Sequence, residues 1–93
     1  MSPTLFTAAG CARCNIARKF LQARRIAFEE HDALSGGKER FAHFYRAHRN
    51  VVVRGKEGVE FPLFVHGDVI RQGVAAIVAY LHAGRALDEF IGR

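Results

Sequence analysis

The chain contains few of the residues that tie a protein together covalently or hold it in a membrane. It has two cysteines, two prolines, one methionine and no tryptophan among its 93 residues. Both cysteines lie in a single CxxC, so no pair remains to cross-link distant segments as in a secreted disulfide scaffold. No apolar run approaches the roughly 20 residues that span a bilayer. The first residues also lack the basic region of a signal peptide. We therefore expect a cytoplasmic protein without a membrane partner.

Acidic residues are also scarce. The chain has nine of them against 14 lysines and arginines, which gives a formal net charge of +5 at pH 7. Such a surface attracts anionic partners, for example an acidic protein face. The basic residues are scattered, however, and neither a stacking-aromatic motif nor a DNA-binding spacing accompanies them. We interpret them as solvated helix faces and predict no nucleic-acid partner.

Apolar residues, in contrast, are plentiful. They make up 49% of the chain, including eight phenylalanines and two tyrosines. This content is sufficient for one core without metal or disulfide support, and the length fits one domain. We predict a single domain over residues 1–93 that is monomeric.

The cysteine motif Cys11-Ala12-Arg13-Cys14 follows a short apolar stretch and opens a helical pattern. A CxxC between a strand and a helix is typical of dithiol redox sites. The free backbone N–H groups and the dipole at a helix N-terminus stabilise a thiolate, which is the reactive form of cysteine. Two thiols three positions apart also lie within reach of each other, so one can attack an outside disulfide and the other can resolve the product. The motif therefore predicts redox chemistry.

Hydrophobic periodicity and turn residues predict the order β-α-β-α-β-β-α. The expected strands cover residues 4–7, 26–32, 62–66 and 69–72, and the expected helices cover about 14–25, 38–48 and 74–84. Residues 86–91 add a turn or two of helix, and 50–60 form either a small hairpin or a loop. The predicted fold class is α/β, with a mixed four-stranded sheet flanked by helices.

Three features together resemble the thioredoxin superfamily, and the glutaredoxins most closely. They are the CxxC after the first strand, the dipeptide Phe61-Pro62 before the third, and the Gly67-Asp68 turn followed by Arg71-Gln72-Gly73. The resemblance covers nearly the whole chain and implies a thioredoxin-like fold and a small thiol-disulfide oxidoreductase that takes part in electron transfer and redox homeostasis. It also implies that Pro62 is cis and faces the CxxC, and that Phe61 presents its backbone to the substrate.

The sequence departs from the glutaredoxin pattern at several positions. Ala12 replaces a usual proline, and the stretch Thr7-Ala8-Ala9 lacks a common lysine. Val74-Ala75-Ala76 stands where glutaredoxins carry a small polar residue and an aspartate that hold the γ-glutamyl end of glutathione. We therefore predict a disulfide-containing protein as the substrate, with glutathione as an alternative partner that is used weakly or not at all.

The sequence thus gives a set of candidate site residues and no cofactor. Cys11 is the predicted nucleophile and Cys14 the resolving thiol. The predicted substrate-binding residues are Arg13, Phe61, Pro62, Gly73 and Val74. Arg13 either tunes the thiolate or is a solvated helix residue, and Phe61 is either a substrate contact or plain core. Gly73 and Val74 are candidates to bind an anionic end of the substrate, because they begin a predicted helix.

Two alternatives remain open at this stage. The cysteines could belong to a metal or iron-sulfur module, for which His43 and His48 are the nearest histidine pair, at a gap longer than compact zinc modules show. The chain could also be a redox-inactive adaptor that uses its basic surface. Glu29, Glu30 and Asp32 could supply a proton acceptor near the cysteines, but by default we assign them to the sheet edge.

Overall fold

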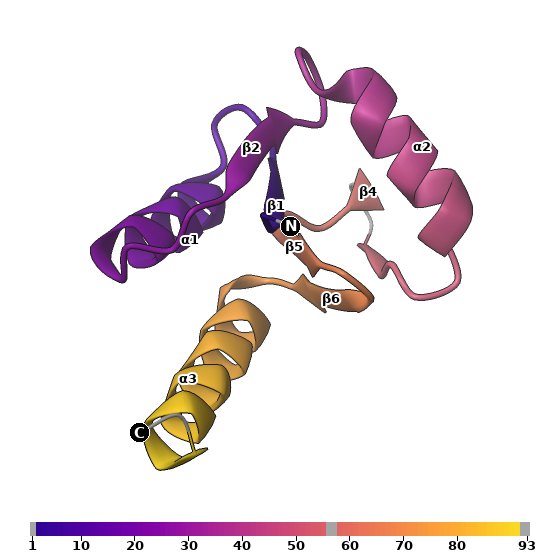
Figure 1. Cartoon of the computed structure of the whole chain (residues 1–93). Helices are drawn as coiled ribbons and strands as arrows, with labels where there is room; N and C mark the ends of the chain where they lie inside the picture. The colour runs from indigo at the N-terminus through magenta and orange to yellow at the C-terminus, as the bar shows by residue number, and fades with distance from the viewer. Residues whose placement is uncertain (1, 56–57, 92–93) are drawn as a thin grey trace.

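The computed structural model of this chain describes residues 2–55 and 58–91. Its strands are β1 (Thr4–Thr7), β2 (Glu29–Asp32), β3 (Arg54–Gly55), β4 (Gly58–Val59), β5 (Leu63–His66) and β6 (Val69–Gln72). Its helices are α1 (Ala12–Ala23), α2 (Lys38–His48) and α3 (Val74–Ile91), and Figure 1 shows how they surround the sheet.

The main sheet has four strands in the order β2-β1-β5-β6. β1 and β2 are parallel, whereas β5 is antiparallel to both β1 and β6. Parallel neighbours need a crossover, and α1 provides it between β1 and β2. The predicted α/β class with a mixed four-stranded sheet is confirmed.

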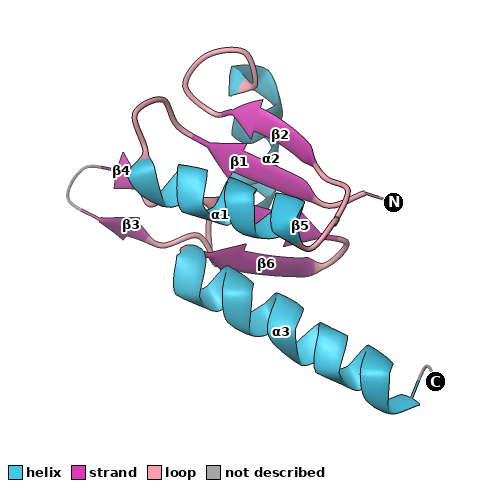
Figure 2. Ribbon diagram, turned by 90° about the vertical axis from the view of Figure 1, so that its left-hand side faces the viewer, coloured by secondary structure: helices cyan, strands magenta, loops and turns pink. Residues whose placement is uncertain are grey.

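Side chains alternate across this sheet and divide the core into two clusters, one on each face. Leu5 of β1 and Phe64 of β5 pack against α1 and α3 in the first cluster. Their neighbours Phe6 and Leu63 point the other way, into a second cluster with Phe44 of α2. Figure 2 accordingly shows α1 and α3 in front of the sheet and α2 behind it. Both β1 and β5 are therefore central strands with two buried faces.

Helix α1 lies two residues earlier than the predicted range of 14–25. It spans Ala12–Ala23, because the Cys11 side chain caps its first turn and its last turn closes as a Schellman motif. In that motif Arg25 takes a left-handed backbone conformation with φ 57°, and the N–H of Ile26 donates to the carbonyl of Leu21 at 3.0 Å. The first cysteine, Cys11, is therefore the N-cap of the helix.

Two other boundaries differ from the prediction. Strand β2 is shorter than the expected range of 26–32, because only Glu29–Asp32 pairs with β1. Ile26 and Phe28 instead pack against the first core cluster from the preceding loop. The third helix was expected to end at Gly84, with a separate turn or two of helix over 86–91, but α3 is one helix that continues to Ile91. One glycine in a helix interior costs only about 1 kcal/mol relative to alanine, so the helix can continue through it.

Residues 50–60, for which a hairpin or a loop was expected, contain a hairpin. β3 and β4 form a two-stranded sheet of their own, in which Arg54 pairs with Val59 and Gly55 with Gly58. The segment before the hairpin contributes Val52 to the second core cluster, and Val59 packs against that cluster. The hairpin is thereby anchored on the α2 face of the molecule.

No helix within residues 2–55 and 58–91 is both long enough and apolar enough to cross a membrane.

Candidate functional site

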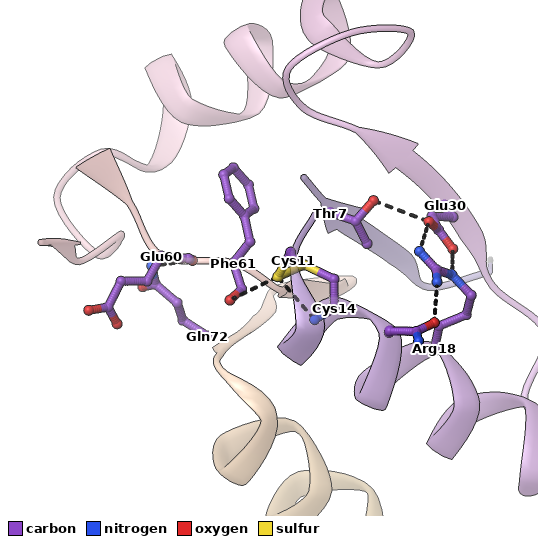
Figure 3. The surroundings of a disulfide bond; sticks show 9 residues. Thr7, Cys11, Cys14, Arg18, Glu30, Glu60, Phe61 and Gln72 are labelled. Carbon is purple, nitrogen blue, oxygen red and sulfur yellow. Dashed lines mark hydrogen bonds and ion pairs between the residues drawn. A yellow bond between two sulfur atoms is a disulfide. The ribbon is translucent and has the colours of Figure 1, made fainter. Parts of the chain in front are cut away.

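Cys11 and Cys14 form a disulfide at the start of α1, with their Cα atoms 5.2 Å apart (Figure 3). The two residues differ sharply in exposure. Cys14 is 1% exposed and lies beneath the surface, whereas Cys11 is partly exposed. An incoming sulfur atom can therefore reach Cys11 and not Cys14.

The Cys11 sulfur takes the place of a helix-capping oxygen. Cys11 is the N-cap of α1, with extended backbone angles (φ −85°, ψ 107°), and its Sγ accepts the N–H of Cys14 at 3.0 Å. The N-cap is the position where free backbone N–H groups and the helix dipole favour negative charge. After reduction, the same N–H is positioned to donate to a thiolate on Cys11.

The last residues of the loop before β5 lie beside the cysteines. The carbonyl oxygen of Phe61 lies 4.0 Å from the Sγ of Cys11, and the Phe61-Pro62 peptide bond is cis, as the resemblance implied. The Phe61 ring points away from the sulfur and packs at a tilted angle against Phe41 of α2, with 5.4 Å between the ring centroids. The Phe61 ring thus packs against the second core cluster, while its backbone lies beside Cys11.

An open cavity of about 560 Å³ lies over Cys11. One side is formed by the end of β1 and the start of α1, and the other by the hairpin segment and Phe61. Its lining residues are Ala8, Cys11, Ala12, Arg13, Gly55, Gly58, Val59, Glu60 and Phe61. Arg13 is exposed here, so its guanidinium can meet both solvent and a bound partner. The cavity has the place and the size to receive a segment of a substrate around its disulfide.

The structure brings together only some of the predicted substrate-binding residues. Among the described residues, Arg13 and Phe61 line the Cys11 cavity, whereas Pro62, Gly73 and Val74 lie outside its lining. Pro62 is buried, and its carbonyl accepts the N–H of Gly73 at 2.9 Å. Gly73 has φ 90°, a conformation that favours glycine, and turns the chain from β6 into α3. Its own N–H is therefore engaged within the protein.

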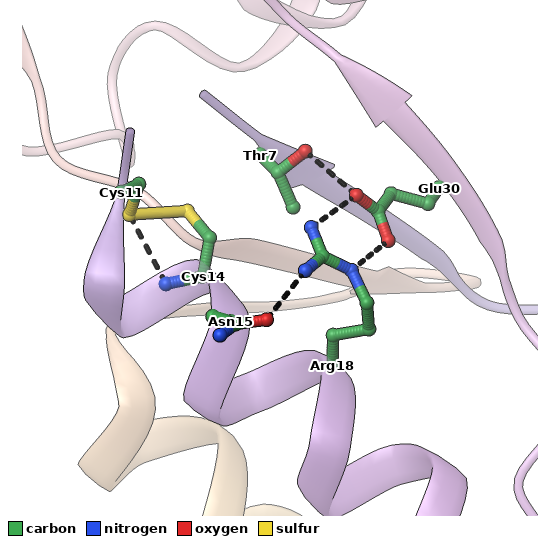
Figure 4. Close-up of polar contacts among 6 residues, drawn as sticks. All are labelled: Thr7, Cys11, Cys14, Asn15, Arg18 and Glu30. Carbon is green, nitrogen blue, oxygen red and sulfur yellow. Dashed lines mark hydrogen bonds and ion pairs between the residues drawn. A yellow bond between two sulfur atoms is a disulfide. The ribbon is translucent and has the colours of Figure 1, made fainter. Parts of the chain in front are cut away.

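A polar network beside the cysteines was not predicted as such. Arg18 of α1 binds Glu30 of β2 in a two-pronged ion pair, with both nitrogen-oxygen distances at 2.6 Å (Figure 4). The hydroxyl of buried Thr7 donates to the same carboxylate at 3.1 Å, and Arg18 also donates to the side-chain oxygen of Asn15. The network borders a second open cavity, of about 420 Å³, that also reaches Cys11.

This network explains the one clear carboxyl shift near the site. The hydrogen bonds from Arg18 hold the pKa of Glu30 below its ordinary value, although partial burial acts in the opposite direction. Glu30 is thus an ionised partner of Arg18 at neutral pH. β2 is an edge strand of the sheet, in agreement with the default assignment of its acidic residues. The sequence alone did not predict a partner for Glu30, because it does not give the register of β1 against β2.

The histidines considered for a metal site lie on α2, across the sheet from the cysteines (Figure 1). His48 stacks on Phe44, and its Nδ1 lies 3.1 Å from the Phe44 carbonyl oxygen. In the described part of the chain, no three His, Cys, Asp or Glu side chains gather closely enough to hold a metal ion.

Comparison with models of protein families gives no match, and comparison with curated proteins gives none. Comparison with solved structures does give matches, among them NrdH-redoxin from Escherichia coli, described as a glutaredoxin-like protein with a thioredoxin-like activity profile. The two chains share 22% identical residues and a TM-score of 0.58, over 80% of this chain and 84% of that one. At this identity the likeness concerns the fold. The chain therefore has the thioredoxin-like fold of this glutaredoxin-like protein, and the fold that the sequence resemblance implied is confirmed.

Proposed function

We propose that this chain, as a monomeric single domain, is a thiol-disulfide oxidoreductase that reduces disulfides of proteins through Cys11 and Cys14. The observation that carries the proposal is the asymmetry of the cysteine pair. The Cys11 sulfur accepts a helix N-terminal N–H at the floor of an open cavity, while Cys14 is buried one turn further along. The match to the fold of a glutaredoxin-like protein supports the same reaction class.

The reaction transfers two electrons from the dithiol to the substrate disulfide. The Cys11 thiolate attacks one substrate sulfur, which forms a mixed disulfide and releases the other substrate sulfur as a thiolate. Cys14 then loses its proton to solvent and attacks the Cys11 sulfur. This step forms the Cys11–Cys14 disulfide and releases the second substrate thiolate. An external thiol or dithiol reductant returns the protein to the reduced state.

The surroundings of the pair favour this order of attack. The thiolate is the attacking species, and the Cys14 N–H together with the dipole of α1 stabilises it on Cys11. We expect the exposed Arg13 to favour the same charge state. The buried Cys14 lies within disulfide distance of Cys11, so the resolving step needs no large movement of α1.

We assign substrate contact to the backbone of Phe61, beside the Cys11 sulfur, and to Arg13 on the opposite side of the cavity. Pro62 fixes the course of the chain into β5 at this point. The roles predicted for Gly73 and Val74 in binding an anionic end of the substrate stay predictions. The proposal places the protein in the cytoplasm, because a dithiol of this kind needs a reducing compartment to be regenerated.

The test is to trap the mixed disulfide. Cys14→Ser leaves Cys11 able to attack but removes the resolving thiol, so it should accumulate covalent adducts with substrate proteins that a reductant releases. Cys11→Ser should accumulate none. Alkylation of the reduced wild-type protein at mildly acidic pH should label Cys11 first. Preferential labelling of Cys14, or adducts on Cys11→Ser, would contradict the assignment, and unreactive thiols would favour an adaptor role.

A further inference from the structure

The Gln72 side chain connects the edge strand β6 to the hairpin segment that borders the Cys11 cavity. Its Oε1 accepts the N–H of Val53 at 2.8 Å. Its Nε2 donates to the carbonyl of Val53 at 2.8 Å and to the carbonyl of Glu60 at 2.9 Å. One amide thus binds the residue that enters the hairpin and the residue that leaves it (Figure 3 shows the Glu60 end beside Phe61).

The chemistry of these contacts requires an amide. A primary amide has two N–H donors and a carbonyl acceptor on one rigid plane, and Gln72 uses both donors and the acceptor. The partners also fix the orientation of the amide, because one backbone N–H and two backbone carbonyls face it. A carboxylate could accept from Val53 but would face the two carbonyl oxygens without a donor. A thioether of similar length would leave all three backbone groups without this partner.

The segment held in this way forms one side of the cavity. Gly55, Gly58, Val59 and Glu60 all lie between the two residues that Gln72 binds or at its end, and all four line the space over Cys11. Glu60 also leads directly into Phe61, whose carbonyl lies beside the Cys11 sulfur. A shift of this segment would therefore change the width of the cavity and the position of the Phe61 backbone together.

Other contacts hold the segment less firmly. β3 and β4 pair only with each other, in a ladder of two residues per strand that is separate from the main sheet. Arg54 reaches Tyr45 of α2, but the nitrogen-oxygen distance is 3.5 Å and the arginine is exposed. Val59 packs against the second core cluster. Within residues 2–55 and 58–91, the polar contacts that tie both ends of the segment to the main sheet are those of Gln72.

We propose that Gln72 is a positioning residue that sets the distance between the hairpin wall and Cys11 and so determines which disulfides the protein reduces. This inference rests on the function proposed above and names its substrate class: disulfides in extended polypeptide segments, which span the cavity from Arg13 to the hairpin wall. A small disulfide reagent needs only the Cys11 sulfur and does not depend on that wall.

The experiment compares Gln72→Met and Gln72→Glu with two controls. Gln72→Met keeps the length of the side chain and removes the hydrogen bonds, and Gln72→Glu keeps only the acceptor. Gln22→Ala removes an exposed glutamine on α1, and Ile77→Val thins the first core cluster on the other face of the sheet. Each protein is assayed with a disulfide-linked peptide and with dithionitrobenzoate, a small disulfide reagent, and the pH profile of Cys11 alkylation is recorded.

We expect both Gln72 variants to raise the KM for the peptide by about fivefold or more, because a hairpin wall that is no longer held in place binds the peptide less well. Their kcat, their rate with dithionitrobenzoate and the pH profile of alkylation should stay near wild type, and both controls should behave as wild type. A loss that is equal for the two substrates, or that Ile77→Val reproduces, would overturn the inference, because it would reflect stability alone.

Amide hydrogen exchange tests the inference independently of activity. The Val53 N–H should be protected in the wild-type protein and should lose that protection in Gln72→Met but not in Gln22→Ala. Unchanged protection in Gln72→Met would overturn the positioning role. Wild-type protein that reduces neither substrate would instead overturn the proposed function, and the exchange result would still decide whether Gln72 holds the segment.

Discussion

The two sides of the Cys11 cavity are built in different ways. The α1 side consists of neighbours in the sequence, in which Cys11 caps the helix that carries Arg13 and Cys14. The hairpin side consists of residues more than 40 positions later, which Gln72 of β6 and the aromatic contacts of α2 hold in place. In the function that we propose, the first side sets the reactivity of the sulfur atom, and the second sets what can reach it.

We therefore expect chemistry and specificity to be separated within this small site. The backbone N–H groups that favour a thiolate belong to the first turn of α1, and any helix leaves such groups free at its N-terminus. The hairpin wall has few backbone hydrogen bonds of its own and depends on side chains from other elements. Changes on the two sides should therefore affect different measured quantities.

The largest expected effect is on glutathione, which would need a third group of contacts at the start of α3. Val74-Ala75-Ala76 offers no polar side chain there, and each lost charge-assisted hydrogen bond costs about 1.5–3 kcal/mol. Glutathione-coupled turnover should therefore be more than about tenfold below turnover with a peptide disulfide and a dithiol reductant. Comparable turnover in the two assays would show that the two sides of the cavity suffice for glutathione.

The next effect is on stability from the α1 side. Leu21 is fully buried between α1 and the sheet, so Leu21→Ala should lower the free energy of unfolding by about 3 kcal/mol, within the usual range of 2–5. The substitution leaves the helix N-cap and the hairpin wall in place. Denaturant unfolding should show the loss, while the KM for a peptide disulfide stays unchanged at temperatures where the protein is folded. A raised KM would show that the two sides are coupled through the core.

Phe41→Ala changes the hairpin side. Phe41 is half-buried and contacts the rings of Phe6 and Phe61, with centroids 5.4 Å away in both cases. We expect a loss of about 2 kcal/mol in the free energy of unfolding, less than for a fully buried phenylalanine. Because Phe61 loses the ring that supports it, the KM for a peptide disulfide should also rise. Alkylation of Cys11 should keep its pH profile, and a shifted profile would contradict the separation.

Arg13→Glu changes the charge beside Cys11 without altering a packed contact, since the side chain is exposed. A carboxylate there disfavours the thiolate and raises the pKa of the reduced Cys11 thiol. Alkylation at neutral pH should slow by about threefold, in line with a solvent-screened charge, and the difference should shrink at high salt. Arg13→Gln, as the neutral control, should give a smaller change. Equal rates for all three proteins would make Arg13 a solvated helix residue.

The smallest effect is expected at the Arg18–Glu30 pair, where both side chains are about one-third exposed. Glu30→Gln should cost about 0.5–1 kcal/mol at neutral pH, because partly exposed ion pairs contribute little. The pKa of Glu30 is lowered in the folded protein, chiefly by the hydrogen bonds from Arg18. The contribution of the pair is therefore present above the ordinary carboxyl pKa and is lost as the pH falls through the lowered value.

Unfolding of wild type and Glu30→Gln across acidic pH checks this sign. The two free energies of unfolding should differ at pH 7 and converge in acid. A difference that grows in acid would contradict the lowered pKa. Thr7→Val, which removes only the neutral donor to the same carboxylate, is the matched control. The difference in free energy of unfolding between wild type and Thr7→Val should depend less on pH.

Local sequence was sufficient for the elements whose cause is local. The range of α2, the β5–β6 hairpin and the position of the CxxC at a helix start all follow from periodicity, turn residues and capping, which act over a few positions. The start of α1 was predicted two residues late, because cysteine is not a usual N-cap residue and only the observed hydrogen bond to Cys11 identifies it as one. The break expected at Gly84, before the further turns of helix over 86–91, was wrong for the opposite reason, since a glycine permits a helix to end but does not require it.

The sequence by itself determined that this chain is an α/β protein with two thiols at a helix N-terminus, because strands, helices and a CxxC depend on side chains close to one another along the chain. Only the tertiary structure decided what surrounds those thiols. The Phe61 carbonyl beside Cys11, the Arg18–Glu30 pair and the three hydrogen bonds of Gln72 each join residues at least 12 positions apart. Such contacts follow from strand register and from packing on the two faces of the sheet, and these arise only when the whole chain has folded.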